Sequence, residues 1–352
     1  MKRCFNVFLL IVITFSLVGC SSNEPRGKVH SNDYLALVTN TAGINDNSFN
    51  QLAWQGLQKA AKELDFDVEY LESVNEEDFM PNLRYFTACA LDMLICIGPE
   101  MADKVREIAE IYPDEYYLMM NYTFDEPLKN VLCVEFEDQE AAFMEGFLAA
   151  YLTKTGIIGL IGGMECGIID AFKYGFEAGM HYAAAELNKQ VSLCVEYINS
   201  FSNKQIAKEV ADKMYEEKGA DIIFHVAGGA GDGVIESAKE HDKFVIGSDM
   251  DQNKMAPKNV ISSAIRNIDK VVYDIAKEIK EVDDVKRITG KSRLLGLKEN
   301  AVGIAPSTKN MVPQELMDKL EKIESDIKNE VIDVPYSEQT FEAYMKKIDR
   351  KN

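Results

Sequence analysis

Polar segments that follow apolar runs in this sequence carry residue types suited to holding a small, uncharged polar molecule. They are residues 45–48 with Asn50, then Asn121, the glycine-rich stretch 227–233, and residues 247–252. Asp249 and Asp251 offer carboxylate oxygens, each able to accept one hydroxyl of a vicinal diol. Asp46 and Ser48 are equally well explained as helix caps, and the neighbouring Phe49 as a core side chain. The residues therefore favour binding, with a purely structural role as the alternative.

The same residues contain no recognisable catalytic motif. The stretch 227–233 lacks both the lysine of a phosphate-binding loop and the spacing of a dinucleotide-binding turn. No GxSxG or HExxH is present, and no histidine has metal-ligand spacing. A glycosidase with paired carboxylates stays an alternative, because a sequence does not give their separation. We expect a binding protein, with no enzyme activity, cofactor or metal.

These segments are positioned by strands and helices that alternate along the chain. Residues 34–38 read as a buried strand, and the apolar spacing of residues 49–64 predicts a helix with one buried face, capped by Asp46 or Asn47. Similar strand–helix units continue to residue 249, which is typical of parallel sheets covered on both faces. Since strand carboxyl ends share one edge of such a sheet, we expect the polar segments to converge there.

The length of the chain and its alternation of strands and helices predict two doubly wound α/β lobes joined by a hinge of two or three strands. We assign residues 33–137 plus 260–290 to the first lobe and residues 138–259 plus 291–352 to the second. A formal charge of −20 and the lack of a basic stripe argue against nucleic acid as a partner.

The N-terminus predicts export and anchoring to a membrane. Residues 1–19 combine a basic start, an apolar run and a small-residue ending, as in a secretory signal. The LVGC ending resembles a lipobox, which implies cleavage before Cys20 and lipidation of its thiol. Residues 20–32 then form a flexible tether. We expect the body of the protein to lie on the extracytoplasmic face of the cell membrane, with its remaining cysteines free rather than paired.

Four blocks of the sequence resemble the signature of a known family, the basic membrane proteins or purine nucleoside receptor A-like lipoproteins of bacterial ABC transporters. The blocks are GINDNSFNQLAWQG, DIIFHVAGGAGDGVIESAK, FVIGSDMDQ and VISSAIRNID. With the lipobox, the resemblance covers nearly all of the mature chain. It implies a type I periplasmic-binding-protein fold whose lobes close on a nucleoside, and ABC permease and ATPase subunits as partners.

The resemblance also implies ligand contacts within these blocks. It places Asp46, Asn50 and Phe201 beside the purine. It places Gly228 or Gly229 and Asp249 beside the ribose, with Asp251 as a second carboxylate there. Phe201 would stack on the base, and Asp249 would be the main ribose contact. Two residues depart from the family pattern: Asn121 replaces a frequent aspartate near the base, and Arg266 replaces a lysine near the ribose. Both departures leave the preferred nucleoside open.

Three alternative functions remain beside a purine nucleoside receptor. The same fold would serve a sugar or a signalling molecule, and a surface adhesin would bind a partner without using the cleft. A nucleoside hydrolase would release a free base.

Overall fold

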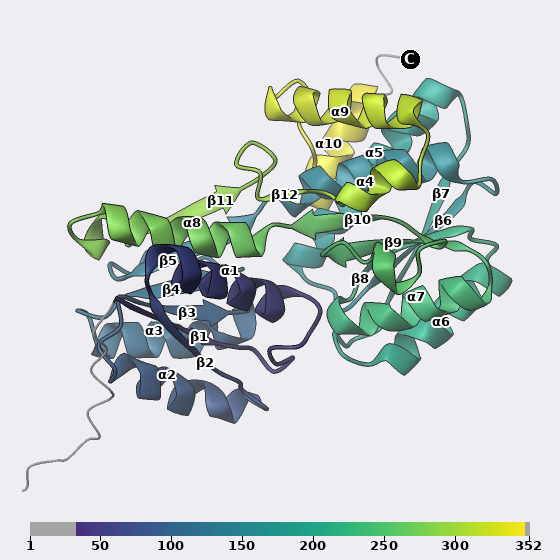
Figure 1. Ribbon diagram of the computed structural model, residues 1–352. Coiled ribbons are helices and arrows are strands. Elements are labelled where there is room, and N and C mark those ends of the chain that lie inside the picture. The colour runs from purple at the N-terminus through teal and green to yellow at the C-terminus, as the bar shows by residue number, and fades with distance from the viewer. Residues whose placement is uncertain (1–32, 349–352) are drawn as a thin grey trace, which may run out of the picture.

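The chain forms two α/β lobes side by side, each built on a six-stranded sheet (Figure 1). The computed structural model describes residues 33–348, so the predicted signal peptide, Cys20 and the whole predicted tether lie outside the described residues. The first sheet runs, from edge to edge, β11 (Lys291–Leu295), β5 (Val131–Phe136), β4 (Tyr117–Met120), β3 (Met93–Ile97), β1 (Tyr34–Val38) and β2 (Asp67–Leu71). The second runs β12 (Val302–Ile304), β10 (Val260–Arg266), β9 (Phe244–Asp249), β8 (Ile222–Val226), β6 (Ile157–Gly162) and β7 (Ser192–Tyr197).

Alternating side chains along β1 show why the first sheet needs helices on both faces. Leu35 and Leu37 belong to the core that contains α1 (Phe49–Leu64) and α8 (Ile268–Glu281). Ala36 and Val38 point the other way, into a core with α2 (Phe79–Thr87) and α3 (Ala102–Ile111). Figure 1 shows these two helix pairs on opposite sides of the sheet. All pairings in this sheet are parallel, as the unbroken apolar strands predict.

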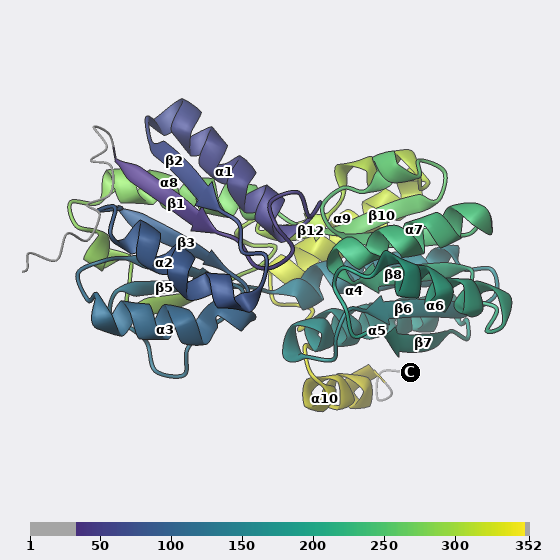
Figure 2. The same cartoon turned by 90° about the horizontal axis from the view of Figure 1, so that it is seen from below.

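The second lobe repeats this layering with more helix on one side. Its first face is covered by α4 (Asp138–Leu152), α5 (Gly167–Leu187) and α9 (Gln314–Lys328), and its second by α6 (Lys204–Glu216) and α7 (Gly231–Glu240). The last helix, α10 (Glu338–Ile348), packs on the outside of α5 (Figure 2). The predicted class of two doubly wound lobes is therefore confirmed, although β12 runs antiparallel to β10.

Three chain segments cross between the lobes, and their positions correct the predicted lobe boundaries. β10, which we assigned to the first lobe, pairs with β9 and β12 in the second sheet. β11, which we assigned to the second lobe, pairs with β5 in the first. The chain thus crosses after β5, after β10 and after β11. β10 is buried on both faces and β11 is a short, largely exposed edge strand, so neither residue pattern reveals which sheet the strand joins.

Candidate functional site

A cavity of about 500 Å³ lies between the lobes, at the carboxyl ends of strands from both sheets. Its wall includes Asp46 and Asn121 from the first lobe and Gly228, Asp249 and Arg266 from the second. The polar segments that follow separate strands therefore do meet, as parallel sheets require. This volume is in the range of pockets that hold small molecules.

Asp46 fixes the start of α1 while lining the cavity. Its Oδ1 accepts the backbone N–H groups of Ser48 (2.9 Å) and Gln51 (3.1 Å), and its Oδ2 accepts the N–H of Asn50 (2.9 Å). The carboxylate thus satisfies the free donors of the first turn, although Ser48 holds the N-cap position. The predicted capping role is present, and contact between Asp46 and a ligand stays a prediction.

Asn50 and Asp251 were expected to face the ligand, but neither lines the cavity. Asn50 is fully buried, and its side chain exchanges hydrogen bonds with the side chain (2.7 Å) and backbone N–H (3.2 Å) of Asn40. Asp251 accepts the Ser307 hydroxyl (2.6 Å) and N–H (3.1 Å). Both side chains hold loops in place behind the wall, because a neighbouring position in sequence does not fix the direction of a side chain.

Asn121 and Phe201 line the cavity from opposite lobes. Asn121 follows β4 with φ of 66°, a left-handed conformation that asparagine tolerates. Among residues 33–348, its side-chain amide forms no hydrogen bond with another residue. Phe201 is 36% exposed and its ring lies against Gly163, where a Cβ would come within 2.2 Å of the ring. Phe201 therefore offers the cavity an aromatic surface, and Asn121 an uncommitted amide.

The glycine-rich stretch brings backbone, not side chains, to the cavity. Gly228 and Gly229 line it from a single 3₁₀ turn, Gly228–Ala230, that leads directly into α7. Gly228 has φ of 52°, which disfavours any residue with a Cβ. The N–H of Ala230 donates to the carbonyl of Phe201 (3.0 Å), so this turn also positions the aromatic ring.

Asp249 joins the two lobes across the cavity. Its Oδ2 accepts a hydrogen bond from the Ser48 hydroxyl at 2.6 Å, and the residues are 201 positions apart. Asp249 ends β9 with φ of 68°, which turns the chain at the cavity wall. Its Oδ1 lies 3.8 Å from the Nε of Arg266. The start of α1 in the first lobe thus contacts the ends of β9 and β10 in the second.

Arg266 is the one basic side chain of the described part that lines the cavity, and its charge is already balanced. Asp138, the first residue of α4, accepts its Nε (2.7 Å) and Nη2 (2.6 Å) in a bidentate pair. The guanidinium carbon lies 5.0 Å from the ring centre of Phe172 and 5.5 Å from that of Phe49, within cation–π reach. Burial raises the pKa of the Asp138 carboxyl, and the Arg266 charge opposes that shift.

Sequence reasoning missed several polar residues of this wall. Asp138 does not line the cavity itself but holds Arg266 there, and it lies two residues after β5, so the strand-end rule that selected Asn121 would also have found it. Glu100 follows the Gly98-Pro99 turn after β3, and Glu76 follows β2. Glu165 and Cys166 stand between β6 and α5. Five carboxylates and one guanidinium line the cavity, which is therefore strongly acidic.

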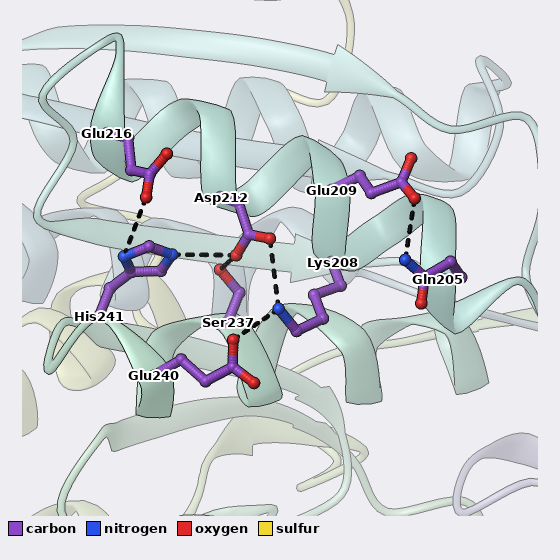
Figure 3. Close-up of polar contacts among 8 residues, drawn as sticks. All are labelled: Gln205, Lys208, Glu209, Asp212, Glu216, Ser237, Glu240 and His241. Carbon is purple, nitrogen blue, oxygen red and sulfur yellow. Dashed lines mark hydrogen bonds and ion pairs between the residues drawn. The ribbon is translucent and has the colours of Figure 1, made fainter.

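A second polar cluster, between α6 and α7, contains serine, histidine and aspartate but is arranged unlike a catalytic triad (Figure 3). Asp212 accepts both the Ser237 hydroxyl (2.6 Å) and the Nε2 of His241 (3.0 Å), and Lys208 pairs with Asp212 and Glu240. A triad needs the histidine between serine and aspartate, whereas here the fully buried Ser237 bonds Asp212 directly. The cluster ties α6 to α7.

Three further features of the described residues bear on the kind of site they form: metal-binding groups, helix hydropathy and cysteines. From residue 33 to 348, no three His, Cys, Asp or Glu side chains are grouped so as to hold a metal ion. In the same range no helix has the length and hydropathy needed to cross a membrane. Cys89, Cys96, Cys133, Cys166 and Cys194 are all free, and Cys166 is exposed at the cavity.

Curated proteins and solved structures resemble this chain over most of its length. Basic membrane protein A1 of Borrelia garinii subsp. bavariensis is 32% identical over 96% of this chain and 99% of its own length. The CD4+ T-cell-stimulating antigen of Listeria innocua is 32% identical over 95% of this chain and 99% of its own. A solute-binding protein of an ABC transporter system from Aeropyrum pernix superposes with a TM-score of 0.78, at 21% identity, over 90% of this chain and 98% of that one.

The family itself is identified by a match over residues 35–338 to the PnrA-like substrate-binding proteins of ABC transporters. The match covers both lobes and every residue of the cavity wall described above. It confirms the predicted family, and it implies a small-molecule ligand, permease and ATPase partners and an extracytoplasmic location. This chain belongs to the PnrA-like family of ABC transporter substrate-binding proteins.

Proposed function

We propose that this protein is a lipid-anchored receptor that captures a purine nucleoside in the interlobe cavity and delivers it to an ABC permease. The charge of the wall carries the proposal. Four of its carboxylates, those of Asp46, Glu76, Glu100 and Glu165, have no ion-pair partner among residues 33–348. The one guanidinium is held by Asp138. An anionic ligand would meet net repulsion, whereas an uncharged ligand rich in hydroxyl and N–H donors would not.

The two walls suit the two halves of a nucleoside. Phe201 provides an aromatic face for a base, and stacking of this kind is worth about 1–3 kcal/mol per base. Asn121 and Asp46 lie on the first-lobe side, where the base edge would reach them. Asp249, Gly228 or Gly229, and Arg266 would surround the ribose from the second lobe. A carboxylate beside exposed backbone amides is a suitable partner for vicinal hydroxyls.

The proposed activity is binding without chemistry. A ligand that contacts both walls has more partners when the lobes are closed, so it shifts the population toward the closed state. The closed form would then be recognised by the permease. Incubation with inosine tests whether the protein binds without chemistry. Release of free base would show nucleoside hydrolysis instead.

A nucleoside panel tests the proposal. We expect inosine, guanosine or adenosine to raise the melting temperature of the purified protein, because ligand at a hundredfold excess over Kd adds about 2.7 kcal/mol to the free energy of unfolding. Ribose alone and nucleoside 5′-monophosphates serve as controls and should give little shift. A shift with ribose but with no nucleoside would indicate a sugar receptor instead.

The lipid anchor is tested separately, through Cys20. Expressed in a bacterium with its full N-terminus, the protein should partition into detergent and carry a labelled fatty acid. The Cys20→Ser variant should do neither, while its melting temperature and nucleoside affinity should match those of the parent. Detergent partitioning that survives the substitution would contradict the anchor.

A further inference from the structure

Glu100 places a carboxylate in the first-lobe wall through an unusual turn. The turn after β3 begins at Gly98, which has φ of 97°, and continues as the 3₁₀ segment Pro99–Met101. A Cβ on Gly98 would lie 2.4 Å from Glu100 Oε2 and 2.9 Å from Oε1. The carboxylate therefore folds back over the glycine, a position that a side chain at residue 98 would block.

This carboxylate and Asn121 follow neighbouring strands at the carboxyl edge of the first sheet. β3 and β4 pair in parallel with Ile97 opposite Met120, and the N–H of Gly98 donates to the Met120 carbonyl (3.2 Å). The residues that follow each strand, Glu100 and Asn121, therefore share one side of the cavity. Together they offer one amide, which both donates and accepts, and one carboxylate, which only accepts when ionised.

Glu100 has hydrogen-bonding capacity that its surroundings leave unused. Asn40 hydrogen-bonds its side chain, but no lysine or arginine among residues 33–348 forms an ion pair with it. Burial, and to a lesser extent the charge of Glu76, raise the pKa of the Glu100 carboxyl. A carboxylate in such a place is stabilised by any ligand that brings N–H donors to it.

We propose that Glu100 is a specificity-determining residue which, with Asn121, selects a purine carrying N–H donors beside its carbonyl oxygen, as guanosine does. This inference rests on the proposed nucleoside function. The Asn121 amide would donate to O6 of guanine, and Glu100 would accept the N1–H and the exocyclic N2–H. Inosine lacks the exocyclic amino group, and adenosine turns the N1 acceptor toward the carboxylate. The expected order of affinity is guanosine, inosine, adenosine.

Isothermal titration of the full protein with these three nucleosides tests the proposal, using the parent and the Glu100→Gln variant. In the parent, guanosine should bind about tenfold more tightly than inosine and about a hundredfold more tightly than adenosine, since each lost or mismatched charged hydrogen bond costs about a factor of ten. In E100Q, the advantage of guanosine over adenosine should fall to about threefold, because the Gln amide accepts from guanine and donates to adenine. The Glu110→Gln variant, which removes an exposed carboxylate of α3 in the same lobe but outside the cavity wall, is the matched control and should keep the parental order.

The outcomes separate this inference from the proposed function. If the parent binds no nucleoside, the proposed function fails and this inference fails with it. If the parent binds the three nucleosides equally, or if its guanosine preference survives in E100Q, nucleoside binding stands and the role of Glu100 is overturned. Because Glu100 is at the cavity surface, E100Q should melt within about 2 °C of the parent, which shows that any change in affinity is local.

Discussion

Two aspartates two positions apart, Asp249 and Asp251, have different surroundings, and this difference makes a matched test at the scale of single residues. Asp249 lines the cavity and accepts the Ser48 hydroxyl, while Asp251 bonds Ser307 behind the wall. We expect Asp249→Ala to weaken nucleoside binding about a hundredfold, because a buried charged acceptor is lost from the ribose side.

Asp251→Ala is the control for that change. It should leave the Kd within about threefold of the parent but lower the free energy of unfolding by about 1–3 kcal/mol, since the Ser307 N–H and hydroxyl lose their acceptor. Titration calorimetry and urea unfolding measure the two effects. Equal losses of affinity in the two variants would remove the assignment of Asp249.

Glu145 predicts a pH dependence of stability. It is fully buried in α4 and accepts the Ser262 hydroxyl at 2.6 Å, while its Oε2 has no hydrogen-bond partner among residues 33–348. Burial raises its pKa from 4.5 to about 8. The folded protein therefore holds a proton that the unfolded chain releases, so its contribution to stability is full below pH 4.5 and is lost as pH rises to about 8, by up to about 1.4 kcal/mol per pH unit.

The Glu145→Gln variant checks this slope by urea unfolding at several pH values. The variant cannot ionise, so its stability should fall less steeply than that of the parent between pH 5 and 8, and it should exceed the parent at pH 8. Parallel curves for the two proteins would mean that Glu145 does not carry the proton.

Residue types and strand ends predicted the wall of the cavity better than its individual contacts. Asp46, Asn121 and Asp249 could be located because each lies at or after the carboxyl end of a strand that faces the cleft. Asn50 could not be excluded from sequence, since only the packed structure shows its amide turned toward Asn40. The Arg266–Asp138 pair joins residues 128 positions apart, and local patterns carry no information about such a contact.

At the scale of elements, the second lobe depends on an unusually close contact between α4 and α5. A Cβ on Gly146 would lie 1.9 Å from the carbonyl oxygen of Phe176, and one on Gly179 would lie 1.9 Å from that of Phe143. We expect Gly146→Ala to destabilise the protein by at least about 1–3 kcal/mol, because the helices must move apart to admit the methyl group.

Gly167→Ala gives the matched comparison within the same helix pair. A Cβ there meets no atom within 4 Å, and Gly167 opens α5 with an ordinary backbone conformation. The free energy of unfolding of the Gly167→Ala variant should equal or slightly exceed that of the parent. Thermal and urea unfolding of the two variants measure the difference, and equal stabilities would contradict the close contact.

Elements with a clear apolar period were predictable, and their partners were not. The apolar spacing of residues 49–64 predicts α1 at its observed bounds, since this helix has one continuous buried stripe. The sequence did not reveal α2, which is only nine residues long, or α10, which buries none of its residues fully. The exchange of β10 and β11 between lobes has the same origin, because pairing depends on contacts far apart in sequence.

At the scale of the whole molecule, the cavity exists because three crossings let the two lobes face each other. Ser48 and Phe49 of the first lobe contact Asp249 and Arg266 of the second, so the lobes meet in the same place that would hold the ligand. A ligand there adds contacts to both lobes at once. Binding and closure are therefore expected to be coupled through differential affinity for the closed state.

Cys166 provides the most direct measurement of this account. Its exposed thiol lines the cavity, whereas Cys89, Cys96 and Cys133 are buried. We would follow alkylation of the Cys166 peptide by mass spectrometry with and without saturating guanosine, inosine or adenosine, with Cys166→Ser as the blank. The account predicts that a purine nucleoside slows alkylation at least about tenfold, while ribose alone and nucleoside 5′-monophosphates do not. Alkylation at an unchanged rate with every nucleoside would contradict binding in the interlobe cavity.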